Sequence, residues 1–177
     1  MITVLSSSRK VTYTAVYVSD KGGWIQEGGQ WYYYENGAKV CNDWRSDGAG
    51  KCYLSADGTI LKNGWAKEGE KWRYLDGSGY ITLNNWAKDS AGWCYMENGY
   101  MVYNVWKKDS KGWCYIGKSG YQVIDGWAKD SVGWCYLGKD GYMVYNTWKA
   151  DSKGWCYINK SGYMVTLKLV SHTVRCN

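Results

Sequence analysis

Tryptophan recurs along the chain at a spacing that suits a series of aromatic ligand sites. The 177-residue sequence holds 13 Trp and 18 Tyr but no Phe. The Trp residues form pairs separated by seven positions, and each pair begins 20 or 21 residues after the previous one. The leading positions are Trp24, Trp44, Trp65, Trp86, Trp106, Trp127 and Trp148, and the second positions are Trp31, Lys51, Trp72, Trp93, Trp113, Trp134 and Trp155.

Paired indoles with a nearby Tyr suit two classes of ligand. A quaternary ammonium group has no N–H to donate, and the electrostatics of aromatic faces can hold it. A sugar ring can instead lay its apolar C–H face on an indole. The residues alone do not choose between these two. Core packing is a third alternative, but burying thirteen indoles would require partners for thirteen N–H groups.

Catalytic chemistry finds little support in the chain. His172 is the only His, so any arrangement of a nucleophile with a His base would depend on it alone. Four Asp residues recur in D-S-x-G loops, whose near-identical surroundings do not give the unlike pair that acid–base catalysis needs; they are Asp89, Asp109, Asp130 and Asp151. We interpret them as turn-forming and expect neither enzyme activity nor a cofactor.

The seven Cys are interpreted mainly as packing residues. In the recurring Trp-Cys-Tyr triplet, strand alternation puts Cys on the face opposite Trp and Tyr. No C-x-x-C pair is present, which argues against a metal site, and an odd number cannot pair fully within one chain. The expected buried set is Cys52, Cys94, Cys114, Cys135 and Cys156, with Cys41 and Cys176 unassigned.

Short strands and tight turns must position these side chains. The 23 Gly argue against long helices. Stretches such as W-C-Y-I and Y-M-V-Y-N are β-type and are separated by E-N-G or G-K-S-G turns, so each repeat predicts one hairpin and a connecting loop. A second, left-handed turn is predicted two residues before most leading Trp, at Asn42, Asn63, Asn84, Asn104, Asp125 and Asn146. Because one hairpin is barely stable alone, seven copies predict an all-β solenoid of stacked hairpins.

The predicted organisation has three parts. Residues 1–22 would form an N-terminal cap strand or degenerate repeat, with V-T-Y-T-A-V-Y-V at 11–18 as the strand. Residues 23–168 would form the seven-repeat solenoid, and residues 169–177 a tail, with T-L-K-L-V-S-H-T-V at 166–174 as a further capping segment. The formal charge of +6 comes from dispersed Lys, which argues against nucleic acid and favours a polyanionic wall polymer. We expect no membrane insertion, and no signal peptide is visible.

The pattern G/N-W-x6-W-x-Y, a turn, and G-Y-M-V-x-N/G-W resembles the choline-binding, or cell-wall-binding, repeats of Gram-positive bacteria and their phages. The resemblance covers about residues 23–168. Related repeats occur in glucan-binding domains and clostridial toxin tails. It implies a left-handed β-solenoid with choline sites between successive repeats, each taking two rings from one hairpin and a third from the next.

The resemblance implies particular site residues. The implied sets are Trp24 and Trp31 with Tyr53, Trp65 and Trp72 with Tyr95, Trp86 and Trp93 with Tyr115, Trp106 and Trp113 with Tyr136, and Trp127 and Trp134 with Tyr157, with Met101, Met143 and Met164 as fourth walls. Two positions depart from the pattern. Lys51 replaces a second Trp, and its charge should repel choline there. Gln122 stands where neighbouring repeats have Met.

The function that the resemblance implies is a non-catalytic module that binds choline of teichoic or lipoteichoic acids. Such a module would anchor a protein at a Gram-positive surface as a secreted, phage-encoded or fragmentary chain, with any wall hydrolase outside these residues. Two alternatives stay open: a module for α-glucan or another cell-wall polysaccharide such as the peptidoglycan glycan, and a structural or adhesive solenoid. The oligomeric state is also open, with a homodimer as one alternative.

Overall fold

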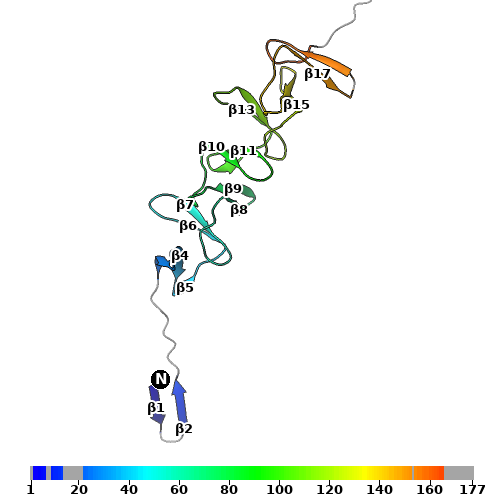
Figure 1. The fold of residues 1–177 in the computed structure, drawn as a ribbon. Helices are drawn as coiled ribbons and strands as arrows, with labels where there is room; N and C mark the ends of the chain where they lie inside the picture. The colour runs from blue at the N-terminus through cyan, green and yellow to red at the C-terminus, as the bar shows by residue number, and fades with distance from the viewer. Residues whose placement is uncertain (1, 7–8, 14–21, 153, 166–177) are drawn as a thin grey trace, which may run out of the picture. The chain divides into compact units, whose positions relative to one another are not determined.

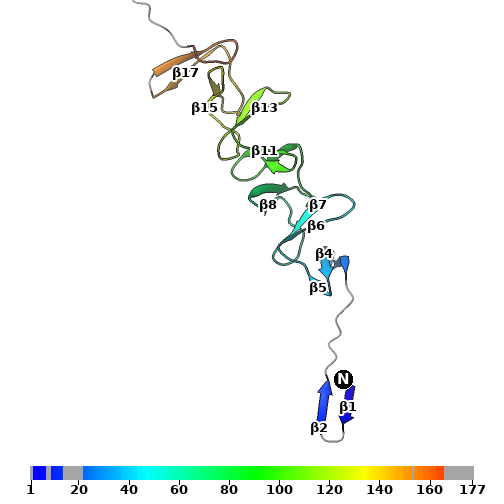
Figure 2. The same ribbon diagram turned by 180° about the vertical axis from the view of Figure 1, so that it is seen from behind.

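The computed structural model describes residues 2–6, 9–13, 22–152 and 154–165. These residues form short β-strands joined by turns (Figures 1 and 2). None of the described segments is a helix with the length and apolar composition needed to cross a membrane. Contacts divide the chain into two compact units, Met1–Ala66 with Leu75–Ile81 and Lys67–Tyr74 with Thr82–Asn177. The sequence-based boundaries at 22/23 and 168/169 stay a prediction.

Antiparallel hairpins follow the Trp repeat. The strands are β1 Ile2–Ser6, β2 Arg9–Tyr13, β3 Gly23–Glu27, β4 Gln30–Glu35, β5 Ala38–Lys39, β6 Asp43–Ser46, β7 Lys51–Leu54, β8 Gly64–Glu68, β9 Lys71–Leu75, β10 Asn85–Lys88, β11 Trp93–Glu97, β12 Tyr100–Met101, β13 Val105–Lys108, β14 Trp113–Ile116, β15 Gly126–Lys129, β16 Trp134–Leu137, β17 Thr147–Asp151 and β18 Gly154–Ile158. Within the described residues, seven pairs match the seven repeats: β3–β4, β6–β7, β8–β9, β10–β11, β13–β14, β15–β16 and β17–β18.

The main ladder of each hairpin lies on the other side of the W-C-Y strand from the one predicted. In β13–β14, Trp106 is opposite Tyr115 and Lys108 is opposite Trp113, so the hairpin tip is the D-S-x-G loop. Asp109 caps this tip, since its Oδ1 accepts hydrogen bonds from the backbone N–H groups of Lys111 (2.8 Å) and Gly112 (3.3 Å). Asp89 and Asp130 accept the equivalent N–H groups, so the interpretation as turn-forming is confirmed for these three Asp residues and stays a prediction for Asp151.

The second β-type stretch of the repeat contributes less pairing than expected. It forms the two-residue strand β12 against β11, across an Asn98–Gly99 turn with both φ angles positive. In later repeats it forms single bridges, such as Ile116 to Gln122. The stretch that precedes each W-C-Y strand pairs along its whole length. It puts Ala opposite Cys in two hairpins, as in Ala128 opposite Cys135, and Lys or Arg opposite Cys in three others.

One face of the hairpin array is a dry core. Its fully buried side chains are Leu54, Leu75, Met96, Ile116, Leu137 and Ile158 with Cys52, Cys94, Cys114 and Cys135. Burial raises the pKa of the Cys94 thiol to about 12, so it stays protonated and packs as a small hydrophobe. The packing interpretation is confirmed for these four Cys residues.

Cys156 is only half-buried, and its position explains the difference. Cys94, Cys114 and Cys135 each form a backbone bridge with a Tyr of the following repeat, at Tyr121, Tyr142 and Tyr163. Within the described residues Cys156 has no such bridge. Cys41 is exposed, and Cys176 lies outside the described residues.

Backbone hydrogen bonds stack each repeat on the one before it. The N–H of Met143 donates to the carbonyl oxygen of Trp113 (2.8 Å), and the N–H of Gln122 donates to that of Trp93 (2.7 Å). An equivalent backbone hydrogen bond joins Met164 to Trp134 in the same compact unit, and another joins Ile81 to Lys51 in the N-terminal unit. These links between repeats confirm the predicted class, an all-β array of stacked hairpins.

The left-handed turns before the leading Trp are confirmed at all but one predicted position. Positive φ angles of 47–51° occur at Asn42, Asn63, Asn104, Asp125 and Asn146. Asn84 differs because its side-chain oxygen accepts the N–H of Asn98 (2.7 Å) across the shorter turn. At the N-terminus, β1 and β2 form a hairpin, and β2 includes the first three residues of the strand expected at 11–18; the rest of that stretch lies outside the described residues. The capping segment expected at 166–174 lies outside the described residues.

Candidate functional site

The aromatic face of the hairpins is half exposed. The second Trp of each complete pair from Trp31 to Trp134 exposes between 38% and 47% of its surface. Trp155, in the last described hairpin, exposes 73%. Rings that only packed a core would be covered, whereas these rings are open to solvent, and Trp31, Trp93 and Trp113 line surface cavities.

Six of the seven leading Trp residues pack against a Tyr of their own hairpin. Trp106 and Tyr115 have ring centroids 5.0 Å apart, and Trp127 and Tyr136 have theirs 5.1 Å apart. The other pairs, at 5.0–5.3 Å, are Trp24–Tyr33, Trp44–Tyr53, Trp86–Tyr95 and Trp148–Tyr157. This contact follows from the register, which puts the two residues directly opposite one another on the same face.

The Trp106 cavity, of about 410 Å³, is lined by four aromatic residues, against three each at the Trp86 and Trp24 cavities described below. Its lining residues are Trp106, Trp113, Asp130, Met143, Tyr145, Ser161 and Tyr163. Met143 is held there by the bond from its N–H to the Trp113 carbonyl. Gly162 gives room for Met143 and Tyr145, because a Cβ on Gly162, at φ +84°, would overlap the Met143 sulfur.

A carboxylate forms the polar wall of the Trp106 cavity. Asp130 accepts the N–H groups of Val132 (2.8 Å) and Gly133 (3.0 Å) on Oδ1 and the Tyr163 hydroxyl (3.0 Å) on Oδ2. Burial alone would raise the pKa of Asp130, but the hydrogen bonds from Gly133, Val132 and Tyr163 outweigh it and leave the pKa below its usual value. The cavity therefore carries a negative charge at neutral pH.

The Trp86 cavity, of about 430 Å³, occupies the corresponding place one repeat earlier. Its lining residues are Asn85, Trp86, Trp93, Asp109, Ser110, Lys111, Gln122, Asp140 and Tyr142. The Tyr142 hydroxyl donates to Oδ2 of Asp109 (2.7 Å). Burial by itself raises the pKa of Asp109. The hydrogen bonds from Tyr142 and from the N–H groups of Lys111 and Gly112 lower it by more, so the pKa of Asp109 lies below its usual value.

The Trp24 cavity, of about 360 Å³, lies in the other unit. Its lining residues are Trp24, Trp31, Asp47, Ile60 and Tyr80. The Tyr80 hydroxyl donates to Oδ2 of Asp47 (2.7 Å), and this bond is the largest cause of the lowered pKa of Asp47. Its apolar wall is Ile60, where the Trp106 cavity has Met143.

A Tyr–Asp hydrogen bond thus recurs at these cavities and was not predicted from the sequence. The pairs Tyr80–Asp47, Tyr121–Asp89, Tyr142–Asp109 and Tyr163–Asp130 join residues 32 or 33 positions apart. The signal was present in the sequence, because the Asp of D-S-x-G and the Tyr of G-Y both repeat with the period of the Trp pairs.

The structure brings together some of the predicted site residues. Trp106, Trp113 and Met143 share one cavity, Trp86 and Trp93 a second, and Trp24 and Trp31 a third. The backbone N–H of Met164 donates a hydrogen bond to the Trp134 carbonyl oxygen, and the Tyr103 hydroxyl donates one to the sulfur of Met101 (3.4 Å). The lining residues Asp130, Tyr145, Ser161 and Tyr163 were not predicted, and their contribution depends on repeats that stack in space.

The Tyr residues implied as third rings lie against the leading Trp of their own hairpins. Lysines also lie over two of them: Lys107 Nζ is 4.5 Å from the Tyr95 ring centroid, and Lys149 Nζ is 4.6 Å from that of Tyr136. The place of Tyr53, Tyr95, Tyr115, Tyr136 and Tyr157 in ligand sites stays a prediction, as do the roles of Trp65, Trp72, Trp127 and Trp134.

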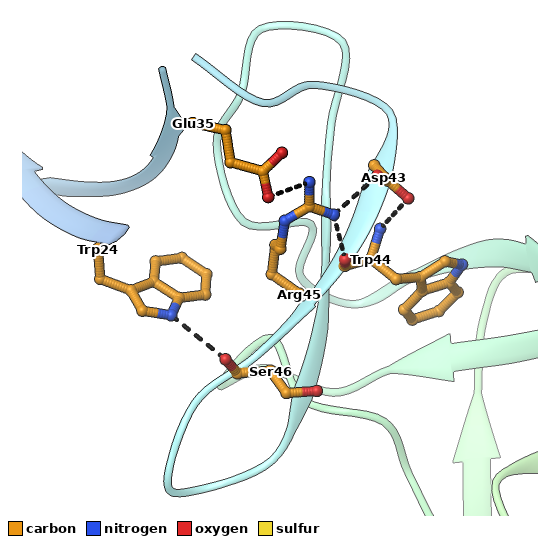
Figure 3. Close-up of polar contacts among 6 residues, drawn as sticks. All are labelled: Trp24, Glu35, Asp43, Trp44, Arg45 and Ser46. Carbon is orange, nitrogen blue, oxygen red and sulfur yellow. Dashed lines mark hydrogen bonds and ion pairs between the residues drawn. The ribbon is translucent and has the colours of Figure 1, made fainter. Parts of the chain in front are cut away.

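In the Trp44 repeat, where Lys51 replaces the second Trp, basic side chains of the protein itself lie over the aromatic rings. Lys51 Nζ is 5.4 Å from the Trp44 ring centroid. Arg45 is 5.3 Å from the Tyr33 ring centroid. Figure 3 shows the ion pairs that hold Arg45, with Glu35 (2.8 Å) and with Asp43 (2.7 Å). The indole N–H of Trp24 points to the Ser46 carbonyl in the same view (3.5 Å). The expectation that Lys51 disables this repeat stays a prediction, and these contacts agree with it.

No group of three or more His, Cys, Asp or Glu in the described ranges is arranged to hold a metal ion. Each of the three cavities has one carboxylate that accepts backbone N–H groups and a Tyr hydroxyl, and the Trp86 cavity has further polar side chains on its walls. Such an arrangement supplies a fixed charge beside aromatic faces.

Comparison with known proteins places this geometry in a family. No family model and no curated protein sequence matches the chain. Among solved structures, choline binding protein F from Streptococcus pneumoniae is 31% identical with a TM-score of 0.53, over 82% of this chain and 52% of that one. The same protein, solved in the presence of a peptidoglycan analogue (tetrasaccharide-pentapeptide), matches with the same values.

A second solved structure, CbpJ from Streptococcus pneumoniae TIGR4, is 28% identical with a TM-score of 0.55, over 82% of this chain and 52% of that one. The chain thus spans about half the length of the proteins that it resembles. The Trp repeat and the stacked hairpins agree with these solved structures, which support the resemblance of the chain to the choline-binding repeat family.

Proposed function

We propose that the chain is a non-catalytic cell-wall-binding module that recognises choline. The Trp106 cavity is the observation that carries this proposal. Trp106, Trp113 and Tyr145 supply three rings, Met143 adds a polarizable wall, and Asp130 supplies a negative charge. A trimethylammonium group needs no hydrogen-bond partner and gains from aromatic faces and a nearby anion. In this arrangement Tyr145 supplies the third ring that the resemblance assigned to Tyr136.

The similar proteins support the choice of ligand. One of them is named a choline binding protein, and it has been solved with a peptidoglycan analogue present. We therefore propose that the partner is a choline-decorated teichoic or lipoteichoic acid of a Gram-positive wall and that the module acts at that surface. Weak sites repeated along one array would raise the overall affinity for a polymer well above that of a single cavity.

The character of the carboxylates supports the non-catalytic part of this proposal. Asp47, Asp109 and Asp130 share one environment, each bonded to a Tyr hydroxyl and to backbone N–H groups with a lowered pKa. General acid catalysis needs a carboxyl group whose pKa is raised. Any hydrolase attached to this module would lie outside these residues.

The test is a choline titration of the whole chain, followed by Trp fluorescence and by calorimetry. We expect saturation at millimolar choline, and Trp113→Ala should remove the site at Trp106 while the remaining sites still bind. Trp155→Ala is the matched control, because Trp155 has the same register in its hairpin but lines none of the three cavities. A response to dextran or purified wall glycan with none to choline would refute the proposal.

A further inference from the structure

We propose that the Trp86 cavity is a saccharide site, different in ligand from the aromatic cage at Trp106. The two cavities occupy equivalent places in successive repeats and share the Trp pair, the Asp of the D-S-x-G loop and the following Tyr. At the remaining walls, each residue that lines the Trp86 cavity and differs from its counterpart at the Trp106 cavity is more polar than that counterpart. This proposal does not depend on choline binding at the Trp106 cavity.

Polar residues replace apolar or neutral ones at the walls of the Trp86 cavity. Gln122 stands where the Trp106 cavity has Met143, and Asp140 stands where it has Ser161. Asn85 and Lys111 line the Trp86 cavity, and the equivalent residues one repeat later are apolar, Val105 and Val132. The third ring is also lost, since Ile124 occupies the place of Tyr145.

These polar groups keep hydrogen-bonding capacity beyond their contacts within the protein. The side-chain N–H of Gln122 donates to the Gly141 carbonyl (3.2 Å), which leaves Oε1 as an acceptor. Asp140 uses Oδ1 to accept the N–H of Tyr142 (3.2 Å), and its second oxygen can accept another donor. Asn85 uses its oxygen for the N–H of Trp86 (2.8 Å), which leaves its NH2 group as a donor. Acceptors and donors therefore line one small cavity.

A quaternary ammonium group fits this cavity poorly. It can neither donate to Gln122 and Asp140 nor accept from Asn85 and Lys111, so binding would remove water from these groups without replacing its hydrogen bonds. The Lys111 ammonium also offsets one of the two carboxylates at this cavity, Asp109 and Asp140, so a cation gains no more charge attraction here than from the single Asp130 at the Trp106 cavity.

A sugar ring matches both halves of the cavity. Its apolar face can lie on the Trp93 indole, of which 43% is exposed. Its hydroxyl groups can donate to Asp140 and Gln122 and accept from Asn85 and Lys111. Ligand pockets that combine an aromatic wall with a few convergent polar groups commonly have volumes of about 300–1,000 Å³, and the Trp86 cavity lies within this range at about 430 Å³.

The indole N–H signals of the 15N-labelled full chain test this assignment, since each Trp gives its own signal. The probes are maltotetraose, chitotetraose and choline chloride, and signals are assigned from single Trp→Phe variants. We expect at least one saccharide to shift the signals of Trp86 and Trp93, and choline at saturation to leave that shift unchanged. The proposal is overturned if neither saccharide moves these two signals, or if choline moves them and displaces the saccharide.

Two substitutions address the cause of the difference. In Gln122→Met and Asp140→Ser, each residue becomes the one that the next repeat carries at that position, so the fold is expected to tolerate both. We expect the saccharide Kd at the Trp86 cavity to rise about tenfold for Asp140→Ser, the loss expected for one hydrogen bond to a charged group. Lys139→Ser, a neighbouring exposed change outside the cavity, should leave the Kd unchanged. Equal affinities for all three variants and wild type would overturn the proposal.

The outcomes separate this proposal from the proposed function. Saccharide shifts at Trp86 and Trp93 without any choline response would support the saccharide site and refute the choline module. Choline shifts at Trp106 and Trp113 without any saccharide response would do the reverse.

Discussion

The hydrogen bond between Tyr142 and Asp109 gives a quantitative test of how the repeats hold together. The Tyr142 hydroxyl, from the segment that follows β16, donates to the Asp109 carboxylate at the tip of β13–β14 (2.7 Å). A hydrogen bond to a charged group contributes about 1.5–3 kcal/mol, and partial exposure of this pair favours the low end. We therefore expect Tyr142→Phe to lower the free energy of unfolding by about 1–2 kcal/mol.

The assay is urea unfolding of the full chain, followed by Trp fluorescence and circular dichroism. With a denaturant slope of about 1–3 kcal/mol per molar, the loss should move the midpoint by roughly 0.3–2 M. Tyr115→Phe is the matched control, because the Tyr115 hydroxyl has no hydrogen-bond partner in the described residues while its ring packs on Trp106. It should change the midpoint little.

A double-mutant cycle with Asp109→Asn isolates the pair. Asn keeps an acceptor for the turn N–H groups but removes the charge that strengthens the bond with Tyr142. We expect a coupling energy near 1 kcal/mol. A coupling below about 0.3 kcal/mol would refute the view that this bond joins the repeats, since independent sites add to within that amount.

The same pair predicts a pH dependence with a definite sign. The bond to Asp109 is the main cause that raises the pKa of Tyr142 to about 12. Because the folded pKa lies above the unfolded value near 10, the contribution is complete below pH 10 and is lost as the pH rises toward 12. The lowered pKa of Asp109 makes its contribution complete above its unfolded value and lost as the pH falls below it. Unfolding at pH 7, 9 and 11 should show a smaller alkaline loss for Tyr142→Phe than for wild type, and equal losses would contradict the assignment.

Three further substitutions test other parts of the structure. Gly162→Ala should cost about 1–3 kcal/mol of stability and weaken choline binding at the Trp106 cavity, because φ is +84° and a Cβ would displace Met143; thermal melts and calorimetry would measure both. Glu68→Gln should destabilise the fold by up to about 3–5 kcal/mol, since it leaves the buried Arg73 guanidinium without its ion-pair partner, and chemical unfolding would measure the loss. Lys51→Trp should add one choline equivalent in calorimetry by restoring the missing ring; an unchanged stoichiometry would show that the repeat is inactive for another reason.

The repeat spacing and the strand alternation were sufficient to predict the hairpins and the buried face. A spacing of 20 or 21 residues between Trp pairs predicts the seven hairpins, and alternation along W-C-Y predicts the buried Cys face. Both follow from backbone geometry, which each repeat satisfies on its own. The left-handed turns at Asn42, Asn63 and Asn104 were predictable for the same reason, because few residues other than Gly accept that conformation.

Pairing partners were harder to predict, because the W-C-Y strand has β-type neighbours on both sides. The choice between them depends on contacts between repeats. The preceding strand pairs along its whole length, and the following segment is drawn instead toward the previous repeat by the bond from Met143 N–H to the Trp113 carbonyl. Residue patterns within one repeat contain no information about that second contact.

The sequence by itself determined the fold class, the repeat number and the Trp pairs that line the cavities. Only the tertiary structure decided which residues complete each cavity. Asp130, Tyr145 and Tyr163 lie 17 to 50 positions after Trp113 in the chain, and they reach its cavity because stacking places successive repeats one above another. The difference between the Trp106 and Trp86 cavities has the same origin, since a change such as Met143 to Gln122 acquires meaning only once its neighbouring Trp pair is known.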